Sequence, residues 1–180
     1  MKLLKYCTIV LYALVITACA SDDSSNSYEN NITVEASTYP MNSAVVETSF
    51  NSVYLNLTNI SEIQIEDSFL GTTITNVDLF TAQINDSDFT PNSTYEFHEI
   101  SSLEFVVNGS IINGEYEDGF VQFYKSGNNS DLEITEGSIT IIDYDVDGIQ
   151  LSFSFTRADG LEITGVYDGS YIYINEFYLD

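Results

Sequence analysis

Basic residues are scarce in this 180-residue chain, where four Lys and Arg stand against 28 Asp and Glu for a formal net charge of −24. Lys2 and Lys5 lie at the N-terminus, so Lys125 and Arg157 are the only strong cations in the rest of the sequence. Binding to nucleic acid or to anionic lipid headgroups needs clustered Lys and Arg. The sequence therefore excludes those partners. It favours cations or cationic partners, although an ordinary solvated acidic surface has the same composition.

Residue types that commonly carry catalysis or bind zinc are also few. His98 is the only histidine, and the two cysteines are Cys7 and Cys19. These numbers exclude the usual zinc ligand sets, and no G-x-S-x-G elbow is present to position a serine nucleophile. Paired carboxylates serve glycosidases, but 28 acids in one small domain form pairs by chance. We therefore expect a protein that is not an enzyme, with a small hydrolase as a distant alternative.

Tryptophan is absent and proline occurs only twice, yet hydrophobic residues make up 44% of the chain and aromatic residues 13%. This composition is too apolar for a disordered chain and is rich in strand-forming residues. Apolar and polar residues alternate at 53–57, 62–66, 103–107 and, most clearly, 149–155, whereas no stretch after position 20 has helical periodicity. Alternation predicts strands with one buried and one solvated face.

Six dipeptides that tolerate positive φ fall between the alternating runs and predict hairpin turns. They are Asn108-Gly109, Asn113-Gly114, Asp118-Gly119, Asp147-Gly148, Asp159-Gly160 and Asp168-Gly169. Their spacing predicts an antiparallel meander in the C-terminal half. The predicted fold is all-β, an antiparallel β-sandwich or a flattened up-and-down barrel of about eight to ten strands. A signal peptide helix and a disordered tether precede it.

The N-terminus resembles the precursor of a bacterial lipoprotein. The apolar run after Lys5 is shorter than the roughly 20 residues that span a bilayer, so it is typical of a signal peptide. Its end resembles the lipobox, here Ile16-Thr17-Ala18-Cys19, in which cleavage exposes the cysteine for lipidation. The predicted parts are a signal peptide at 1–18, a lipidated N-terminus with a flexible tether at 19–31, and one β-domain at 32–180. Ordinary cleavage within Ala18-Cys19-Ala20, or an uncleaved anchor, are the alternatives.

Acidic residues follow the cysteine directly, in Ser21-Asp22-Asp23. They resemble the surface-export signal of Bacteroidota lipoproteins, which implies an anchor in the outer membrane and display on its outward face. The periplasmic face and secretion remain alternatives, because the same composition is typical of a solvated tether.

The C-terminal half resembles small Bacteroidota lipoproteins of unknown function. The resemblance rests on the hairpin from Glu136 to Phe155 and on the strand entry Pro91-Asn-Ser-Thr-Tyr95. The chain departs from the family at Leu151-Ser152, where a glycine often precedes the paired aromatic residues. The resemblance implies a β-rich lipoprotein and no particular activity.

Three aspartates form a candidate cation site. Asp143, Asp145 and Asp147 occupy alternate positions before Gly148, as carboxylates do in the first half of a calcium loop. In an extended strand they would share one face, and their mutual repulsion would favour a bound cation. The loop's twelfth position is Ser154 and not Glu, so a plain hairpin with solvated acids is the competing interpretation. The hypothesis is a weak calcium site, and no other cofactor is expected.

Tyrosines form a candidate binding surface. Tyr171 and Tyr173 are predicted to share one face of a strand, about 7 Å apart. Tyrosines on adjacent strands would extend them into a platform, the candidates being Tyr116, Tyr124, Tyr144 and Tyr167. Tyrosine surfaces bind sugars or peptides through an apolar ring with a polar tip, although ordinary cross-strand packing also explains such residues.

Together these patterns indicate a cell-envelope surface protein that is attached to the membrane by an N-terminal lipid. It would act as a non-catalytic binding or interaction module for an unknown protein or glycan ligand. An envelope-structural or weakly calcium-binding surface protein is the alternative.

Overall fold

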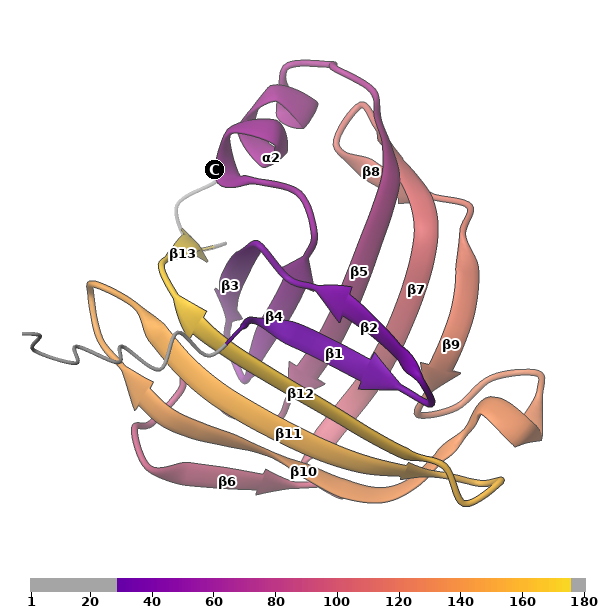
Figure 1. Cartoon of the computed structure of the whole chain (residues 1–180). Helices are drawn as coiled ribbons and strands as arrows, with labels where there is room; N and C mark the ends of the chain where they lie inside the picture. The colour runs from indigo at the N-terminus through magenta and orange to yellow at the C-terminus, as the bar shows by residue number, and fades with distance from the viewer. Residues whose placement is uncertain (1–28, 176–180) are drawn as a thin grey trace, which may run out of the picture.

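Two β-sheets lie face to face, which confirms the predicted all-β sandwich (Figure 1). The computed structural model describes residues 29–175. The first sheet has six strands, in the order β2 (Ser37–Pro40), β1 (Asn31–Val34), β12 (Glu162–Gly169), β11 (Ile149–Arg157), β10 (Ile134–Tyr144) and β6 (Ser93–Glu96). The second has seven, in the order β13 (Tyr171–Asn175), β3 (Ser43–Ser49), β4 (Ser52–Thr58), β5 (Ile74–Ile84), β7 (Ile100–Ile112) and β8 (Glu115–Glu117), with β9 (Phe120–Tyr124) also paired to β7.

The described strands outnumber the predicted eight to ten, because several have only three to five residues. Alternation is hard to recognise in segments that short. All strand pairs are antiparallel except β13 with β3. The predicted meander is present as β10, β11 and β12, which follow one another in the chain and in the first sheet.

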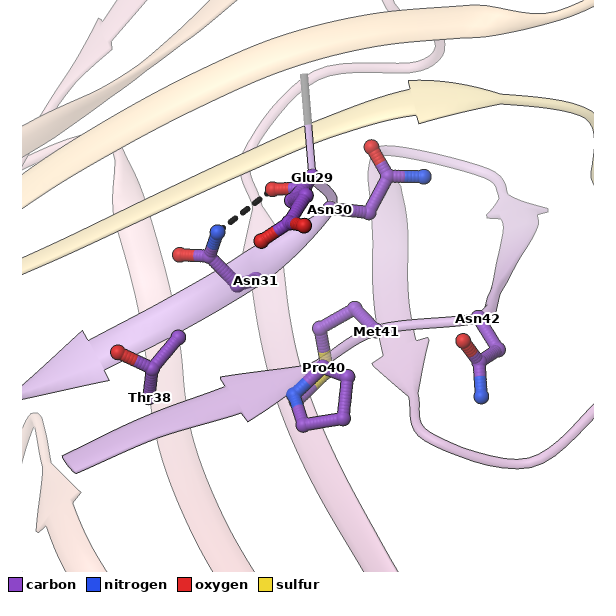
Figure 2. A pocket seen from close by; sticks show the side chains of 7 residues that line it. All are labelled: Glu29, Asn30, Asn31, Thr38, Pro40, Met41 and Asn42. Atoms are coloured by element: carbon purple, nitrogen blue, oxygen red, sulfur yellow. Dashed lines mark hydrogen bonds between the residues drawn. The ribbon is translucent and has the colours of Figure 1, made fainter. Parts of the chain in front are cut away.

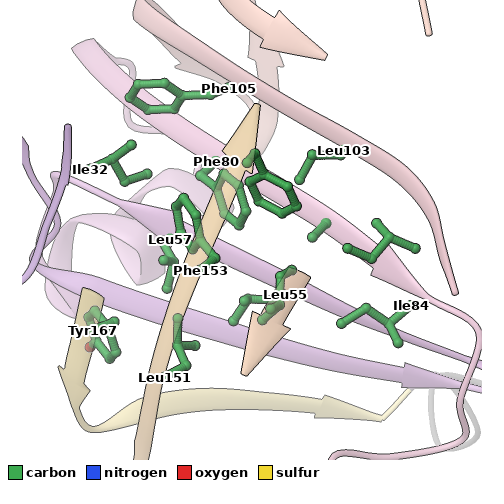
Figure 3. Packing of buried hydrophobic residues seen from close by; sticks show 14 of the residues in the cluster. Ile32, Leu55, Leu57, Phe80, Ile84, Leu103, Phe105, Leu151, Phe153 and Tyr167 are labelled. Carbon is green, nitrogen blue, oxygen red and sulfur yellow. The ribbon is translucent and has the colours of Figure 1, made fainter. Parts of the chain in front are cut away.

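The core lies between the sheets, and the alternating apolar residues supply it. In β11 the predicted inward residues Ile149, Leu151, Phe153 and Phe155 are all buried. Phe153 stacks on Phe80 of the opposite sheet, with ring centroids 4.6 Å apart and an interplanar angle of 6° (Figure 3). Such a ring pair adds to the burial of apolar area that holds the sheets together.

The segment predicted as a strand at 62–66 is the helix α2 (Glu62–Phe69), so that prediction was wrong. Ser61 is its N-cap, and the Ser61 side chain and the Gln64 backbone and side chain form a capping box. This S-x-x-Q signal outweighs two alternating isoleucines. Ile65 is buried against the outer face of the second sheet in a small cluster with Ile60 and Val77.

Three of the six predicted turn dipeptides close hairpins, namely Asn113-Gly114, Asp147-Gly148 and Asp159-Gly160. The other three were wrong as hairpins. Asn108-Gly109 lies inside β7, where a register shift opposite Val77 marks a bulge. Asp118-Gly119 joins β8 and β9, which both pair with β7. Asp168-Gly169 ends β12, just before the chain crosses to the other sheet as β13. Positive φ at Asn108 and Asp118 suits a bulge or a kink as well as a turn.

The sandwich has two ends that differ in chemistry. The tyrosine end contains the β10–β11 turn at 145–148, the start of β13 and the β5–β6 loop at 85–92. The arginine end contains the β11–β12 turn, the β1–β2 turn and the short helix η1 (Ser130–Leu132). The strand β10 runs from one end to the other, and its 11 residues span about 35 Å at the usual rise. Of the helices in the described part of the chain, none has the length and apolar character to cross a membrane.

Candidate functional site

A hollow of about 460 Å³ opens at the tyrosine end, and we call it the tyrosine hollow. Its lining comes from three segments that are far apart in the sequence. These segments are the β5–β6 loop, the β10–β11 hairpin and β13, and they contribute Asp88, Tyr144, Asp145, Val146, Tyr171 and Tyr173.

Strand β13 places Tyr171 and Tyr173 in the hollow because period two puts both on one strand face. The intervening Ile172 packs on the opposite face, against the cluster beneath α2. Ser170 lies where the chain passes from β12 in one sheet to β13 in the other. Its hydroxyl donates to Glu62 Oε1 in the first turn of α2 at 2.6 Å, and this bond fixes the start of β13. The predicted shared face is therefore present.

The hydroxyls of both tyrosines are engaged within the chain. Tyr171 donates to the Asp145 carbonyl at 2.8 Å, which ties β13 to the β10–β11 turn. The Tyr173 hydroxyl lies 2.9 Å from Thr48 Oγ1. Tyr173 is nevertheless 48% exposed. The rings, more than the hydroxyls, are therefore the surface offered to a ligand.

Tyr144 joins the two sheets at the hollow. Its ring centroid lies 5.3 Å from that of Tyr171 and 5.6 Å from that of Phe89. Phe89 is buried and also contacts Tyr95, whose hydroxyl accepts from Thr90 N and donates to Asp86 Oδ2. This aromatic row fixes the loop that carries Asp88.

Burial raises the pKa of Tyr144 well above its ordinary value, and the neighbouring Tyr171 hydroxyl and Asp88 carboxylate raise it further. Tyr144 therefore keeps its proton throughout the physiological range. Of the described lining residues, Asp88 and Asp145 carry acidic groups and none carries a basic group.

The three aspartates of the calcium hypothesis line a second, adjacent hollow of about 320 Å³, which we call the acidic hollow. Asp145 belongs to both hollows, and Asp168 and Ser170 also line this one. Asp143, Asp145 and Asp147 are exposed.

The sequence predicts that these aspartates share one face of an extended strand, and the structure shows that they do not. Asp143 follows a register shift in β10, and the other two lie in the turn. Asp145 Oδ1 accepts from the backbone N–H groups of Asp147 and Gly148 at 2.8 and 3.1 Å. Among the described residues, no three His, Cys, Asp or Glu side chains are grouped so that they could hold a metal ion. Weak calcium binding stays a prediction.

The platform predicted from other tyrosines does not form, except for Tyr144. Tyr167 is 2% exposed, within the core. Tyr116 lies on β8, where its hydroxyl donates to the Val77 carbonyl, and burial raises its pKa to about 12. The Tyr124 hydroxyl hydrogen-bonds the backbone of Asn129. These three have structural roles away from the hollow.

At the arginine end, a buried guanidinium joins three segments. Arg157 pairs with Asp159 at 2.6 Å and with Glu35 of the β1–β2 turn at 3.5 Å. It also donates to the Gln122 carbonyl of β9 at 3.0 Å. The hydrogen bond from Arg157, helped by the Leu161 N–H, lowers the pKa of Asp159.

The other strong cation of the described chain also has a structural role. Lys125 Nζ donates to the carbonyls of Phe97 and Ile100 and lies 4.3 Å from the centroid of the Phe97 ring. Burial lowers its pKa. His98 lies exposed in the same β6–β7 turn.

A further hollow of about 460 Å³ lies where the described chain begins (Figure 2). There Asn30 donates to the Asp168 carbonyl at 3.1 Å and accepts from the Asp168 N–H at 2.7 Å. The amide thus secures the entering chain beside β12, at the tyrosine end. The lipidation and export residues predicted from the sequence, Cys19, Ser21, Asp22 and Asp23, lie outside the described residues.

Sequence reasoning found Tyr171, Tyr173 and Tyr144 but missed Asp88 and Val146. Asp88 sits in a polar loop with no pattern that links it to β13. Val146 is 93% exposed at the tip of the β10–β11 turn, an unusual place for a valine. The sequence signal that could have identified Val146 is its position as an apolar residue between two turn aspartates, Asp145 and Asp147.

Comparison of the chain with protein-family models, with curated proteins and with solved structures gave no match. The resemblance to Bacteroidota lipoproteins therefore stays a prediction, and the case for function rests on the site itself.

Proposed function

We propose that this protein is a lipid-anchored surface protein of the cell envelope, and that it binds a protein or glycan ligand in the tyrosine hollow without chemical turnover. The observation that carries the proposal is the meeting of Tyr144, Tyr171 and Tyr173 in one open hollow. Aromatic rings supply large contact area at low entropy cost, which is why tyrosine is common in binding surfaces.

The lining favours binding over catalysis. Among the described residues, two carboxylates and three phenols line the tyrosine hollow, and none of the lining residues carries an imidazole, amine, thiol or aliphatic hydroxyl. The lining therefore lacks histidine, the commonest general acid or base, and the usual serine, cysteine and lysine nucleophiles, although carboxylates and phenols can also take those roles. The segments that line the hollow are also held in place by contacts with one another. The Tyr171 hydroxyl donates to the Asp145 carbonyl, and the Phe89 ring packs against Tyr144. A preformed site loses less entropy on binding.

The proposed anchor suits this arrangement. The described chain starts at Glu29 at the tyrosine end, and about ten residues separate it from Cys19, a span of at most about 35 Å. A lipid on Cys19 would therefore keep the tyrosine end close to the membrane surface. The ligand of the tyrosine hollow is then expected to belong to a neighbouring component of the envelope.

Two measurements test the proposal. Intact-mass analysis of the membrane fraction should find the chain beginning at an acylated Cys19, and Cys19→Ser should abolish membrane attachment. Glycan and peptide arrays should give hits for the wild-type chain that Tyr173→Ala removes and Phe120→Ala keeps. Phe120 is a matched control because it is an aromatic residue that is 70% exposed and does not line the hollow. Hits that survive Tyr173→Ala would contradict the assigned site.

A further inference from the structure

We propose that the tyrosine hollow takes a lysine or arginine side chain from a basic peptide segment of a protein partner. This inference rests on the proposed binding function and specifies its ligand class. It is argued from ring faces, carboxylates and the placement of the chain's own cations.

The hollow combines the two features that recognise an organic cation. The faces of tyrosine rings attract ammonium and guanidinium groups placed within about 6 Å of the ring centroid. Asp88 and Asp145 add carboxylates to the same lining. A guanidinium can lie on a ring and donate to a carboxylate at the same time.

The described part of the chain, residues 29–175, supplies no cation of its own to these carboxylates. Lys125 and Arg157 are the only Lys and Arg between residues 29 and 175. Lys125 is held by two backbone carbonyls, and Arg157 is held by Asp159, Glu35 and Gln122 at the opposite end. Because no described Lys or Arg compensates the charge at the tyrosine end, a partner can supply the compensating cation.

The adjoining acidic hollow extends the same preference. It shares Asp145 with the tyrosine hollow and adds Asp143, Asp147 and Asp168. A peptide with consecutive basic residues would place one side chain over the rings and the next over these carboxylates. The exposed Val146 lies on the turn between Asp145 and Asp147 and offers the peptide an apolar contact.

Anions are disfavoured, and neutral sugars can gain hydrogen bonds to the carboxylates but no Coulomb attraction. The Tyr171 and Tyr173 hydroxyls already hydrogen-bond Asp145 and Thr48, so fewer donors remain to read sugar hydroxyls. A cationic ligand instead gains from the negative potential of the whole molecule, which also speeds its association.

The test is calorimetric titration of the full chain in detergent with a blocked tetra-arginine peptide, and with tetra-serine and tetra-glutamate as comparisons. We expect binding of tetra-arginine only, weakened by added salt. Asp88→Asn and Tyr173→Ala should each weaken it by about 3- to 30-fold, the range of a partly desolvated cation–π or charge contact. Asp131→Asn removes the same charge from an exposed site on η1, and Phe120→Ala removes an exposed ring elsewhere. Both should change the affinity less than twofold, and melting curves should show all four variants folded.

The outcomes separate the two proposals. Equal losses in Asp88→Asn and Asp131→Asn would show attraction to net charge alone and overturn the cation site. Tetra-serine binding as tight as tetra-arginine would overturn the charge preference. If tetra-arginine fails but an array hit is lost in Tyr173→Ala, the cation inference falls and the binding function stands. If no array hit depends on Tyr173 either, both fall.

Discussion

The two ends of the sandwich use the same kind of turn for different purposes. At the arginine end, Asp159 Oδ1 accepts from the Leu161 N–H and from Arg157, so its charge is balanced inside the molecule. At the tyrosine end, Asp145 Oδ1 accepts only from backbone N–H groups of its own turn among the bonds described, beside three phenol rings. Both turns contain an Asp-Gly pair, Asp147-Gly148 and Asp159-Gly160, and such a pair shows where a chain reverses. The neighbours of a turn aspartate in space decide whether its carboxylate is paired with a cation, as in Asp159, or is exposed beside aromatic rings, as in Asp145.

The largest expected effect is at the arginine end. Arg157→Ala should lower the free energy of unfolding by about 3 kcal/mol, because it removes charged hydrogen bonds to three segments and the buried stem of the side chain. Urea unfolding followed by circular dichroism measures it. Arg157→Lys keeps the charge but loses the planar guanidinium group. Its free energy of unfolding should lie between those of the wild type and Arg157→Ala. A loss below about 1 kcal/mol in Arg157→Ala would mean that this network does not hold the end together.

Tyr144 separates packing from polarity at the other end. Tyr144→Ala should cost about 1.5 kcal/mol, since the half-buried ring contacts Phe89 and Tyr171. Tyr144→Phe keeps these ring contacts and should cost less than about 0.5 kcal/mol. The same urea titrations compare the two variants. Equal costs would show that the hydroxyl, and not the ring, supports the hollow.

Tyr173 should affect binding more than stability. Its ring is 48% exposed and its hydroxyl bonds only Thr48 among the contacts described. Tyr173→Ala should therefore lower the unfolding free energy by at most about 1 kcal/mol, while abolishing array hits that the wild type gives. If stability falls as far as in Arg157→Ala, the residue is a structural anchor, and the contrast between the ends is lost.

The smallest effect is the pH dependence of the Arg157–Asp159 pair. The pKa of Asp159 is lowered below 3.8 in the folded chain, with the hydrogen bond from Arg157 as the main cause. Its stabilising contribution is therefore present above the unfolded value and is lost as the pH falls through the folded value. The stability difference between wild type and Asp159→Asn should stay constant from about pH 7 to pH 5 and shrink toward about pH 2. A difference that grows on acidification would contradict this sign.

The sequence predicted the architecture better than the connections. Period two located β4, β7 and β11, because burial of one face imposes the pattern directly on the residues. The alternation failed at 62–66, where a capping box forms α2. The turn signal failed at Asn108-Gly109, where positive φ at Asn108 accompanies a bulge. The first failure has a local cause, because the capping box joins Ser61 and Gln64, whereas the second depends on Val77 in β5, which is distant in the sequence.

The candidate site was predictable in part for the same reason. Tyr171 and Tyr173 share a face by strand geometry alone. Their meeting with Tyr144 depends on the crossing of the chain from β12 to β13, between the sheets, and Asp88 arrives from the unpatterned β5–β6 loop. The spacing of residues within any one strand or loop therefore does not predict that Tyr144, Asp88 and the two tyrosines of β13 lie together.

The most direct test of the central claim is a two-dimensional NMR titration of the full chain in detergent with the tetra-arginine peptide. We expect shifts concentrated at Asp88, Tyr144, Val146 and Tyr173, with the resonances of Glu35, Gln122 and Asp159 unchanged. Shifts spread evenly over the acidic surface, or concentrated at the arginine end, would contradict it.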